Sequence, residues 1–452
     1  MEIIWLTIYS IFFIGLGVLV FKRSFDPLNF FVAGKNNGIW ATTSSLLATI
    51  IGSSAILGTV SMSLKYGWAA AWFLMSASIG LISLTLVVKK VNRLGKFTLP
   101  ELLNDFYGPK VKFIASLTIP IAWTSVIAAQ IIGSAVILNI FIGLSYFWAV
   151  VLSTLVFALY TFLGGQLSVI RTDKYHFVLI LVGLCIICGF ALKKLNLPLW
   201  QLAPHSFPFS EKFSIFNLLT LILTYSTAFL VGPDIYARIF CAKNEKVAQV
   251  SVWLSALILI PIAWGLCFIG VYANHYYPDI DSRSFAGLSQ MLKNLLPVWS
   301  WGLIIIFFLS AFMSSANSTL LTSATILTDL FKNIHKTSSI ILTRGLITLL
   351  AIFSLGIALL TNSIIDSLLL GLSFFTGAFV CPVLAGLAGW KINEWFVMLA
   401  VIVGGCLSVS GKIVMMNGAN VLGNVLIVIG FLFNAVILVI GRNQSSLDLP
   451  NS

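Results

Sequence analysis

Long apolar stretches separated by short polar segments run through the whole chain. A stretch of about 18 or more apolar residues is long enough to cross the hydrocarbon core of a bilayer as a helix. Thirteen stretches meet this description, and they are Ile3–Val20, Trp40–Leu64, Trp68–Val88, Phe113–Ile142, Tyr146–Leu163, Tyr175–Leu192, Ile215–Val231, Val252–Ala273, Val298–Leu327, Ile340–Leu360, Ile364–Leu387, Trp395–Ser410 and Val421–Ile440. Because the segments between them are short, we expect an all-α polytopic membrane protein without a soluble domain.

Two of these stretches are interrupted near their centres by small or polar residues. Gly52, Ser53 and Ser54 interrupt the second stretch, and Thr224–Thr227 interrupts the seventh. In a bilayer, a helix can unwind only where protein or a water-filled cavity replaces its lost hydrogen bonds. The carbonyls freed before such a break can coordinate a cation, and the amides that open the next half-helix can hold a polar or anionic group. The alternative is that the small residues only allow two helices to approach closely.

The spacing of the two interruptions predicts an internal symmetry. They lie five spans apart, and five spans reverse the orientation of a helix in the membrane. We therefore expect residues 35–195 (spans two to six) and residues 196–390 (spans seven to eleven) to form an inverted repeat, each half opening with a discontinuous helix. Residues 1–34 would add one extra transmembrane helix, and residues 391–452 would add two.

The ninth stretch carries a third concentration of polar residues. Hydroxyl and amide side chains surround nearly three helical turns, and they are Ser314, Ser315, Asn317, Ser318, Thr319, Thr322 and Ser323. A single Ser or Thr can satisfy itself by bonding to the carbonyl four residues earlier. Seven together indicate a helix face that lines water or an ion. A sodium ion takes about five or six oxygens, and neutral carbonyls and hydroxyls suffice where the dielectric constant is low.

Composition and charge agree with a membrane protein. The chain is 59% hydrophobic and 9% charged, and its mean hydropathy is +1.04. With the N terminus outside and the C terminus cytoplasmic, 19 of the 26 Lys and Arg residues fall near cytoplasmic span ends and seven fall outside. This asymmetry follows the positive-inside rule of cell-membrane proteins. It accounts for most of the net charge of +12, so nucleic acid is an unnecessary partner.

Catalytic and metal-binding chemistry finds little support in the sequence. The six cysteines and four histidines are not clustered with further candidate ligands. Asp173 and Asp366 are the only acids expected deep in the membrane, and one isolated carboxylate does not make a catalytic pair. We therefore expect neither an enzyme nor a bound cofactor, apart from a coupling ion.

Five segments together resemble the sodium/solute symporter family. They are LLATIIGSSAILG in the second span, KYGWAAAW at the start of the third, GGQLSVIRTDKYH (Gly164–His176), PDIYARIFCAKNEKVA (Pro233–Ala248) and AFMSSANSTLLTSATILTDLF in the ninth span. The resemblance extends over nearly the whole chain. Members of the family carry sugars, proline, pantothenate, sialic acid or iodide on a LeuT-type inverted-repeat core, so it implies this fold and sodium as the coupling ion.

The resemblance also implies cation ligands. The family's sodium site corresponds here to the backbone carbonyls of Ala48, Ile51 and Ala311 and the hydroxyls of Ser314 and Ser315.

Some members have a second sodium site, which corresponds here to Asp173, Asn317 and Ser318. An amide replaces one hydroxyl at that position, which puts a second sodium in doubt. The alternative for Asp173 is a helix-capping role beside Arg171 and Lys174.

The substrate branch is only partly indicated. Sugar-transporting members place a Glu-Gln pair where this chain has Ser54 and Ala55, and a Gln where it has Ser373, so a galactose-like polyol would lose its partners. The segment KYGWAAAW is closer to the pantothenate and proline branches. No Arg is expected in mid-membrane, although the half-helix N terminus near Ser53 can bind a carboxylate. The substrate-binding candidates are Ser53, Ser54, Phe73, Tyr225, Ser373 and Phe374, with Phe73 as an outer aromatic gate.

The interpretation that unites these features is a sodium-coupled symporter that imports a small organic solute by alternating access. An amino acid, vitamin or organic acid is favoured over a sugar. Two alternatives stay open: proton coupling through Asp173 on the same fold, and a solute sensor that does not transport.

Overall fold

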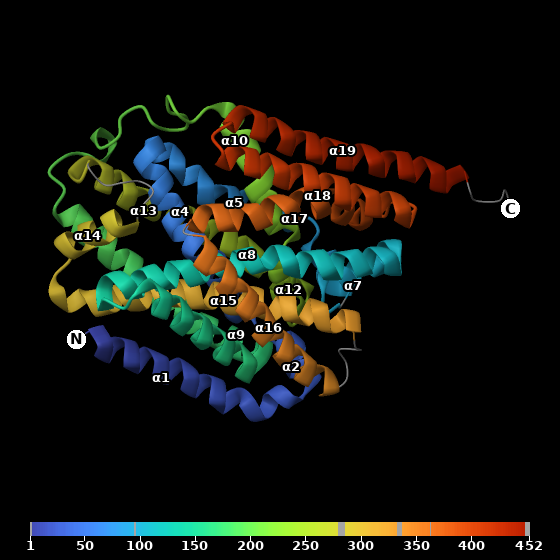
Figure 1. Cartoon of the computed structure of the whole chain (residues 1–452), viewed down its shortest axis with the longest axis horizontal. Helices are drawn as coiled ribbons and strands as arrows, with labels where there is room; N and C mark the ends of the chain where they lie inside the picture. The colour runs from blue at the N-terminus through green and yellow to red at the C-terminus, as the bar shows by residue number, and fades with distance from the viewer. Residues whose placement is uncertain (1, 95, 279–284, 332–336, 362, 448–452) are drawn as a thin grey trace.

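The computed structural model describes residues 2–94, 96–278, 285–331, 337–361 and 363–447, and these residues form a helical bundle (Figure 1). The α-helices are α1 (Glu2–Phe21), α2 (Pro27–Val32), α3 (Ile39–Ile50), α4 (Ser53–Tyr66), α5 (Ala71–Leu84), α6 (Val88–Leu94), α7 (Leu99–Tyr107), α8 (Pro109–Ile142), α9 (Tyr146–Lys193), α10 (Ile215–Leu221), α11 (Thr227–Val231), α12 (Pro233–Phe240), α13 (Glu245–Tyr276), α14 (Phe285–Leu295), α15 (Trp301–Phe331), α16 (Thr337–Leu360), α17 (Ile364–Leu387), α18 (Glu394–Met416) and α19 (Asn420–Leu447).

Within the described residues, 11 helical segments are long and apolar enough to cross a membrane. One of them joins the second half of the predicted second span to the third span, and another contains the predicted fifth and sixth spans. The segment Ser53–Leu84 contains α4 and α5, which fold back on each other so that the Phe73 ring lies against Gly58. The segment Tyr146–Lys193 is α9, which bends at Gly165. All thirteen predicted stretches are therefore mainly helical, although the second is interrupted at Ile51 and Gly52, and the prediction of an all-α membrane protein is confirmed.

The bend in α9 depends on a glycine. Gly165 has φ 57° and ψ −159°, a conformation that residues with a side chain rarely adopt. The hydroxyls of Tyr160 and Thr172 hydrogen-bond to each other across the bend, although a straight helix would separate these residues by about 18 Å. The two halves of α9 are consequently two spans that the chain connects without a loop.

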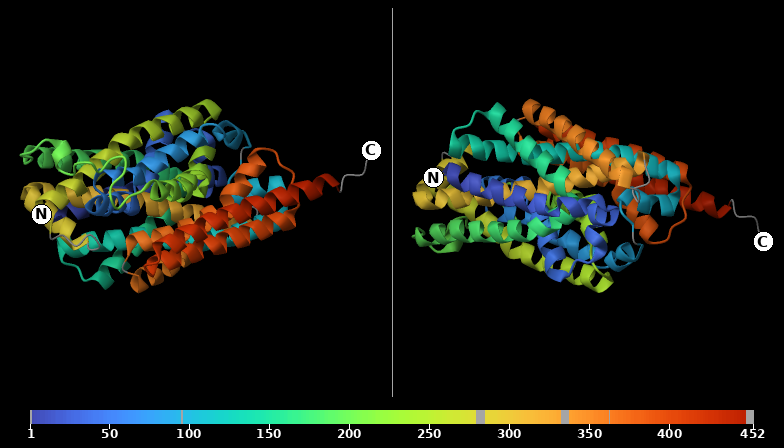
Figure 2. Two further views of the ribbon diagram at one scale, coloured as in Figure 1. Left: turned by 90° about the horizontal axis from the view of Figure 1, so that it is seen from above. Right: turned by 90° about the horizontal axis from the view of Figure 1, so that it is seen from below.

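The long helices run roughly along one axis, and the start of α1 and the end of α19 lie at opposite ends of the molecule (Figures 1 and 2). Helix α15 lies inside the bundle and packs against α1, α8, α9 and α16. Almost all of its residues are buried, including the seven polar residues predicted to surround it. Its polar surface therefore faces other helices, which is the condition under which a membrane helix tolerates so many hydroxyls.

The N-terminal helix α1 packs into the bundle. Its Phe13 ring stacks on His176 of α9, with ring centroids 4.0 Å apart. The Tyr9 hydroxyl contacts the sulfur of Met313 in α15 at 3.6 Å. Helix α1 thus covers a buried surface of the two helices that carry the polar residues discussed below.

The predicted break in the second span is present. Helix α3 ends at Ile50, helix α4 begins at Ser53, and Gly52 between them is extended (φ −94°, ψ −168°). The apolar halves on either side are short helices, and the break lies in a fully buried region.

The predicted break in the seventh span takes a different form. Residues Ile222–Ser226 form one π-helical turn between α10 and α11, so the chain stays helical through Thr224 and Tyr225. The helix stops one turn later at Gly232 (ψ 131°), and α12 starts at Pro233. The expectation of an unwound segment at Thr224–Thr227 was wrong, because the hydroxyls there bond to carbonyls of the preceding turn, as Thr224 does to Thr220 at 2.8 Å.

Candidate functional site

The break between α3 and α4 lies directly against the polar stretch of α15. The hydroxyl of Ser315 is 2.8 Å from the carbonyl oxygen of Thr49 and 3.3 Å from that of Ala48. These three neutral oxygens are named here the neutral oxygen cluster. The second and ninth spans are therefore in contact at Ala48 and Ser315, as a sodium site formed by both residues would require.

Close approach of the two elements requires a glycine at the break. A Cβ atom on Gly52 would lie 2.6 Å from Ser315 Oγ and 2.8 Å from Gln130 Oε1. The first amide of α4 also needs a partner, since it has no carbonyl within its own helix. Gln130 of α8 supplies it, because its Oε1 accepts from the Ser53 amide at 2.7 Å, and the Ser53 hydroxyl donates to the Ala129 carbonyl at 3.0 Å. Helix α8 therefore fixes the start of α4.

A second group of polar residues lies beside the first and carries charges. The Asp173 carboxylate accepts hydrogen bonds from the hydroxyls of Ser314, at 2.6 Å, and Ser45. Arg238 of α12 places Nη2 3.8 Å from Asp173 Oδ2 and donates to the Ser318 hydroxyl. Asp173, Arg238, Ser45, Ser314 and Ser318 are named here the charged cluster.

Both ions of the charged cluster are completely buried. The side chains of Asp173 and Arg238 have no exposed surface. A buried ion pair is stable only when hydrogen bonds compensate for the water that each ion has lost. The carboxylate has such bonds on both oxygens, whereas Arg238 Nε and Nη1 have no hydrogen-bond partner among the described residues.

One hydrogen bond connects the two clusters. The hydroxyls of Thr49 and Ser318 are 3.0 Å apart. Two adjacent residues of α15 thus face different partners, since Ser315 reaches the α3 carbonyls and Ser314 reaches Asp173.

Some of the other predicted cation ligands lie near the two clusters, and others are directed away from them. Ile51 is the residue at the break itself, and Ala311 lies one turn before Ser315 on buried α15. The Asn317 side chain turns toward Thr161 of α9, whose hydroxyl donates to its Oδ1 at 3.1 Å. Asp173 lies inside α9 and does not cap a helix. The structure therefore brings Asp173 and Ser318 together through Arg238 but directs the Asn317 oxygen elsewhere.

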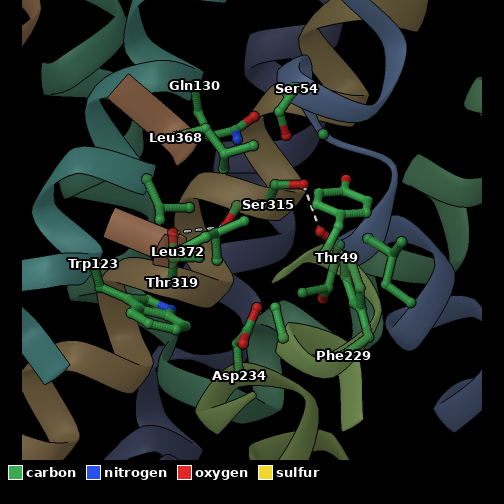
Figure 3. A pocket seen from close by; sticks show the side chains of 15 residues that line it. Thr49, Ser54, Trp123, Gln130, Phe229, Asp234, Ser315, Thr319, Leu368 and Leu372 are labelled. Carbon is green, nitrogen blue, oxygen red and sulfur yellow. Dashed lines mark hydrogen bonds between the residues drawn. The ribbon is translucent and has the colours of Figure 1, made fainter. Parts of the chain in front are cut away.

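A small pocket of about 50 Å³ adjoins the neutral oxygen cluster (Figure 3). Its walls come from five parts of the chain: Thr49, Gly52 and Ser54 around the break, Trp123 and Gln130 of α8, Tyr225, Phe229 and Asp234 around the π-helical turn and α12, Ser315 and Thr319 of α15, and Leu368 and Leu372 of α17. Thr49, Gly52 and Ser315 belong to this wall and also border the neutral oxygen cluster. An ion in that cluster and a solute in the pocket would consequently share a wall.

The predicted solute-binding residues divide between the pocket and its surroundings. Ser54 and Tyr225 line the pocket, and Ser53 lies behind Ser54 with its polar groups bound to α8. The Phe73 ring is buried and stacks on Tyr225, with centroids 4.3 Å apart, so it supports the wall.

The two candidates on α17 lie outside the pocket. The Phe374 ring packs against Gly405 of α18, and Ser373 is not a lining residue. Leu368 and Leu372, which are four residues apart on one face of the helix, line the pocket instead.

Sequence reasoning missed three polar residues of this region: Gln130, Asp234 and Arg238. Arg238 is one of the 19 Lys and Arg residues expected near cytoplasmic span ends, yet its side chain is fully buried beside Asp173. Asp234 is a further acid inside the bundle, which the expectation of only Asp173 and Asp366 did not include. A signal was present in the segment PDIYAR, where Asp234 and Arg238 are one helical turn apart in an otherwise apolar context. Gln130 is likewise an isolated amide within an apolar run.

Comparison with protein families gives a match over most of the chain. The model described as "Sodium:solute symporter family" matches residues 30–404. Among individual proteins, a sodium/proline symporter of Staphylococcus aureus is 23% identical over 418 residues, covering 86% of this chain and 81% of that protein.

Solved structures share the fold. A Na+-coupled sialic acid symporter in a substrate-bound outward-open state has a TM-score of 0.81 at 18% identity, covering 99% of this chain and 98% of that one. The nucleobase-cation-symport-1 family transporter Mhp1 has a TM-score of 0.64 at 12% identity, covering 93% and 95%. A manganese transporter of Eremococcus coleocola has a TM-score of 0.59 at 16% identity, covering 90% and 95%.

Proposed function

This chain belongs to the sodium:solute symporter family, and on that premise we propose that it imports a small organic solute by sodium-coupled alternating access. It is a multi-pass membrane transporter and not an enzyme. The observation that carries the proposal is the contact of Ser315 with the carbonyls of Ala48 and Thr49 at the break of a membrane helix.

The neutral oxygen cluster is the proposed sodium site. A hard cation prefers oxygen ligands, and carbonyl dipoles freed at a helix break point toward such an ion. The proposed ligands are those that the family resemblance implies, Ala48, Ile51, Ala311, Ser314 and Ser315. Ser315 already lies within hydrogen-bond distance of the α3 carbonyls, whereas the Ser314 hydroxyl donates to Asp173 and would have to turn toward the ion. When sodium binds, the Ser315 hydroxyl turns a lone pair toward the ion, and its hydrogen bond to Thr49 is exchanged for ion coordination.

A single sodium per cycle is the proposed stoichiometry. A second sodium would have to use Asp173, Asn317 and Ser318. The positive charge beside Asp173 and Ser318 is supplied by Arg238, and the Asn317 oxygen is used by Thr161. The charges of Asp173 and Arg238 therefore balance each other within the charged cluster, and no added ion is needed there.

Sodium and solute are coupled through the shared wall. Sodium holds Thr49, Gly52 and Ser315 in fixed positions, and these residues border the pocket. The solute then binds a preformed pocket, and the loaded core rocks inward. Proline symporter relatives support an amino-acid-like solute, and the half-helix N terminus at Ser54 can hold its carboxylate.

The energy available to one sodium is sufficient for concentrative uptake. A unit charge that crosses a potential of about 100 mV gains roughly 2.3 kcal/mol. A tenfold sodium gradient adds about 1.4 kcal/mol. Together these support a solute ratio of some hundreds.

The proposed location is the cell membrane, with the N terminus outside and the C terminus cytoplasmic. The support is the distribution of Lys and Arg, of which 19 of 26 then lie at cytoplasmic span ends. Opposite termini also fit an odd number of spans. The division into inverted repeats at residues 35–195 and 196–390 is likewise proposed from the spacing of the two irregular helices.

Substitution of Ser315 tests the proposal directly. In Ser315→Ala the only side-chain ligand that touches the α3 carbonyls is removed, so sodium should no longer raise the melting temperature of the purified protein relative to potassium. Sodium-stimulated uptake into proteoliposomes, with L-proline as the first solute, should disappear as well. Ser323→Ala is the matched control, because Ser323 bonds only to the Thr319 carbonyl of its own helix, at 2.7 Å.

Unchanged sodium dependence in Ser315→Ala would contradict the site. The same liposomes separate the two coupling ions. Uptake that ignores sodium but stops with a protonophore would favour a proton-coupled transporter with Asp173 as the carrier. Binding of solute without any counterflow would favour a sensor.

A further inference from the structure

We propose that the solute carries an ammonium group, which Asp234 and the aromatic side chains Trp123, Tyr225 and Phe229 recognise. This inference rests on the proposed function, since it names the chemical class of the solute in the same pocket. It goes beyond that function because neither a free carboxylate nor its aromatic neighbours are needed for sodium coupling.

Asp234 gives the pocket a negative charge. It is the only lining side chain in the described part of the chain that carries a formal charge. It stands at the start of α12, directly after Pro233, and it is half-buried and lines the pocket. Figure 3 shows its carboxylate directed into the pocket, on the side away from Ser54 and Gln130.

No cation of the described residues compensates this charge at ion-pair distance. Arg238 lies one turn further along α12, but its Nη2 is directed at Ser318 and Asp173. The backbone amides of Asp234 and Ile235 hydrogen-bond to the carboxylate, and Arg238 attracts it electrostatically without forming an ion pair with it. A carboxylate in so small a space needs a positive partner, and a bound ammonium group would supply it.

Aromatic rings complete the environment of a cation. Trp123, Tyr225 and Phe229 line the same pocket, and in Figure 3 Asp234 lies between Trp123 and Phe229. The rings of Tyr225 and Phe229 meet edge to face, with centroids 5.0 Å apart, and Phe73 holds Tyr225 from behind. Ring faces attract ammonium and quaternary ammonium groups, most strongly where water is excluded.

The opposite side of the pocket suits the other end of an amphoteric solute. Ser54 and Gln130 lie there, next to the N terminus of α4. On the Asp234 side, the indole Nε1 of Trp123 is buried without a hydrogen-bond partner among the described residues, so a donor for a solute oxygen is available there. The pocket therefore fits a zwitterion or a hydroxylated amine better than an uncharged polyol or a simple carboxylic acid.

The test compares ammonium compounds with their carbon isosteres on the wild-type protein. Sodium-dependent thermal stabilisation and competition for uptake are measured for L-proline against cyclopentanecarboxylate, glycine betaine against tert-butylacetate, and choline against neohexanol. We expect at least one ammonium compound to bind about thirtyfold or more tightly than its isostere, the change expected when one partner of a buried charge pair is lost. The three pairs also show whether the solute needs a carboxylate, since choline lacks one.

The carboxylate is then neutralised without a change of size. Asp234→Asn should reduce the affinity for the preferred ammonium compound by a similar factor and should leave the sodium-dependent stabilisation measured without solute unchanged. Asp366→Asn is the control, because Asp366 pairs with Lys412 on α18 outside the pocket.

Failure of every ammonium compound to bind better than its isostere would overturn the inference. So would Asp234→Asn with an undiminished preference. If Asp234→Asn does not fold, the isostere comparison on the wild-type protein decides alone. Sodium-driven uptake of an isostere would refute this inference and leave the proposed function intact, whereas an unaltered sodium response in Ser315→Ala would refute the proposed function.

Discussion

Two neighbouring groups of oxygens in the core of this protein differ in how their charge is compensated. The neutral oxygen cluster joins the α3 carbonyls to Ser315 and contains no ion of its own. The charged cluster, which begins one residue away at Ser314, contains a carboxylate and a guanidinium. A single hydrogen bond between Thr49 and Ser318 connects them.

The difference shows that a buried carboxylate is a poor guide to an ion site in a membrane protein. Asp173 attracts attention in the sequence because it is charged, yet Arg238 already balances it. The carbonyls of Ala48 and Thr49 carry no side-chain signal in the sequence, and only the family resemblance indicated Ala48; yet no charged side chain is bound to these oxygens. A bound cation is stabilised most where carbonyl dipoles point toward one place and no positively charged side chain already occupies it.

The strongest test of this contrast removes the built-in cation. Arg238→Gln leaves Asp173 buried without its partner, and breaking a buried pair in this way costs about 3–5 kcal/mol. We expect a large fall in melting temperature and in the yield of folded protein. In the double variant Asp173→Asn with Arg238→Gln, both ions are neutralised together, so most of that stability should return.

Arg171→Gln is the control for the arginine substitution, since Arg171 is exposed on α9 close to Asp173 in sequence. It should melt within a degree or two of the wild type. If Arg238→Gln alone is as stable as the wild type, Arg238 does not compensate the charge of Asp173. The proposal of a single sodium per cycle would then be contradicted, because it depends on that compensation.

A middle-sized effect is expected from filling the space between the break and α15. In Gly52→Ala the new methyl group would lie 2.6 Å from Ser315 Oγ, so the two elements must move apart. Overpacking of this kind typically costs about 1–3 kcal/mol. The sodium concentration for half-maximal stabilisation should rise about tenfold or more.

Gly38→Ala is the matched control for the glycine substitution. Gly38 precedes α3, and a Cβ atom there would meet no heavy atom within 4 Å. Its sodium response should equal that of the wild type. Equal sodium responses of Gly52→Ala and Gly38→Ala would separate the neutral oxygen cluster from sodium binding.

The smallest effect should come from the bond that connects the clusters. Thr49→Val removes the hydroxyl that contacts Ser318 and keeps the Thr49 carbonyl. The net value of such a bond is about 1 kcal/mol, so the half-maximal sodium concentration should rise roughly fivefold. Thr59→Val removes a comparable hydroxyl, bonded to the Ala55 carbonyl in α4, and should leave the sodium response unchanged. If Thr59→Val changes the half-maximal sodium concentration more than Thr49→Val does, the hydrogen bond between Thr49 and Ser318 has no special role in sodium binding.

The sequence was sufficient for the spans and for the break at Gly52, whereas its contact with Ser315 followed only from the family resemblance. Apolar length determines where a chain crosses a membrane, and a mid-span Gly-Ser-Ser is incompatible with a lipid-facing helix. It was insufficient for Asp234 and Arg238, because α12 has only eight residues and follows a stop at Gly232. The hydropathy of this segment does not show that the polar side chains of so short a helix lie in the buried core.

The seventh span illustrates a second limit. Thr224, Tyr225 and Ser226 are polar enough to predict unwinding, but the backbone has two ways to accommodate polar side chains within a membrane helix. Here the hydroxyls bond within the preceding turn and the helix widens into a π-helical turn. Local hydrogen bonding, which depends on rotamers, decides between the two outcomes.

The π-helical turn at Ile222–Ser226 has an implication for how relatives of this protein diverge. Such a turn is an α-helix that accommodates one surplus residue. Loss of a single codon within it would restore regular pitch and rotate Tyr225 by about 100° relative to the residues before it. A deletion, with no change of any remaining side chain, would thereby change which side chain of this segment faces the solute pocket, and so could alter the solute that a relative accepts.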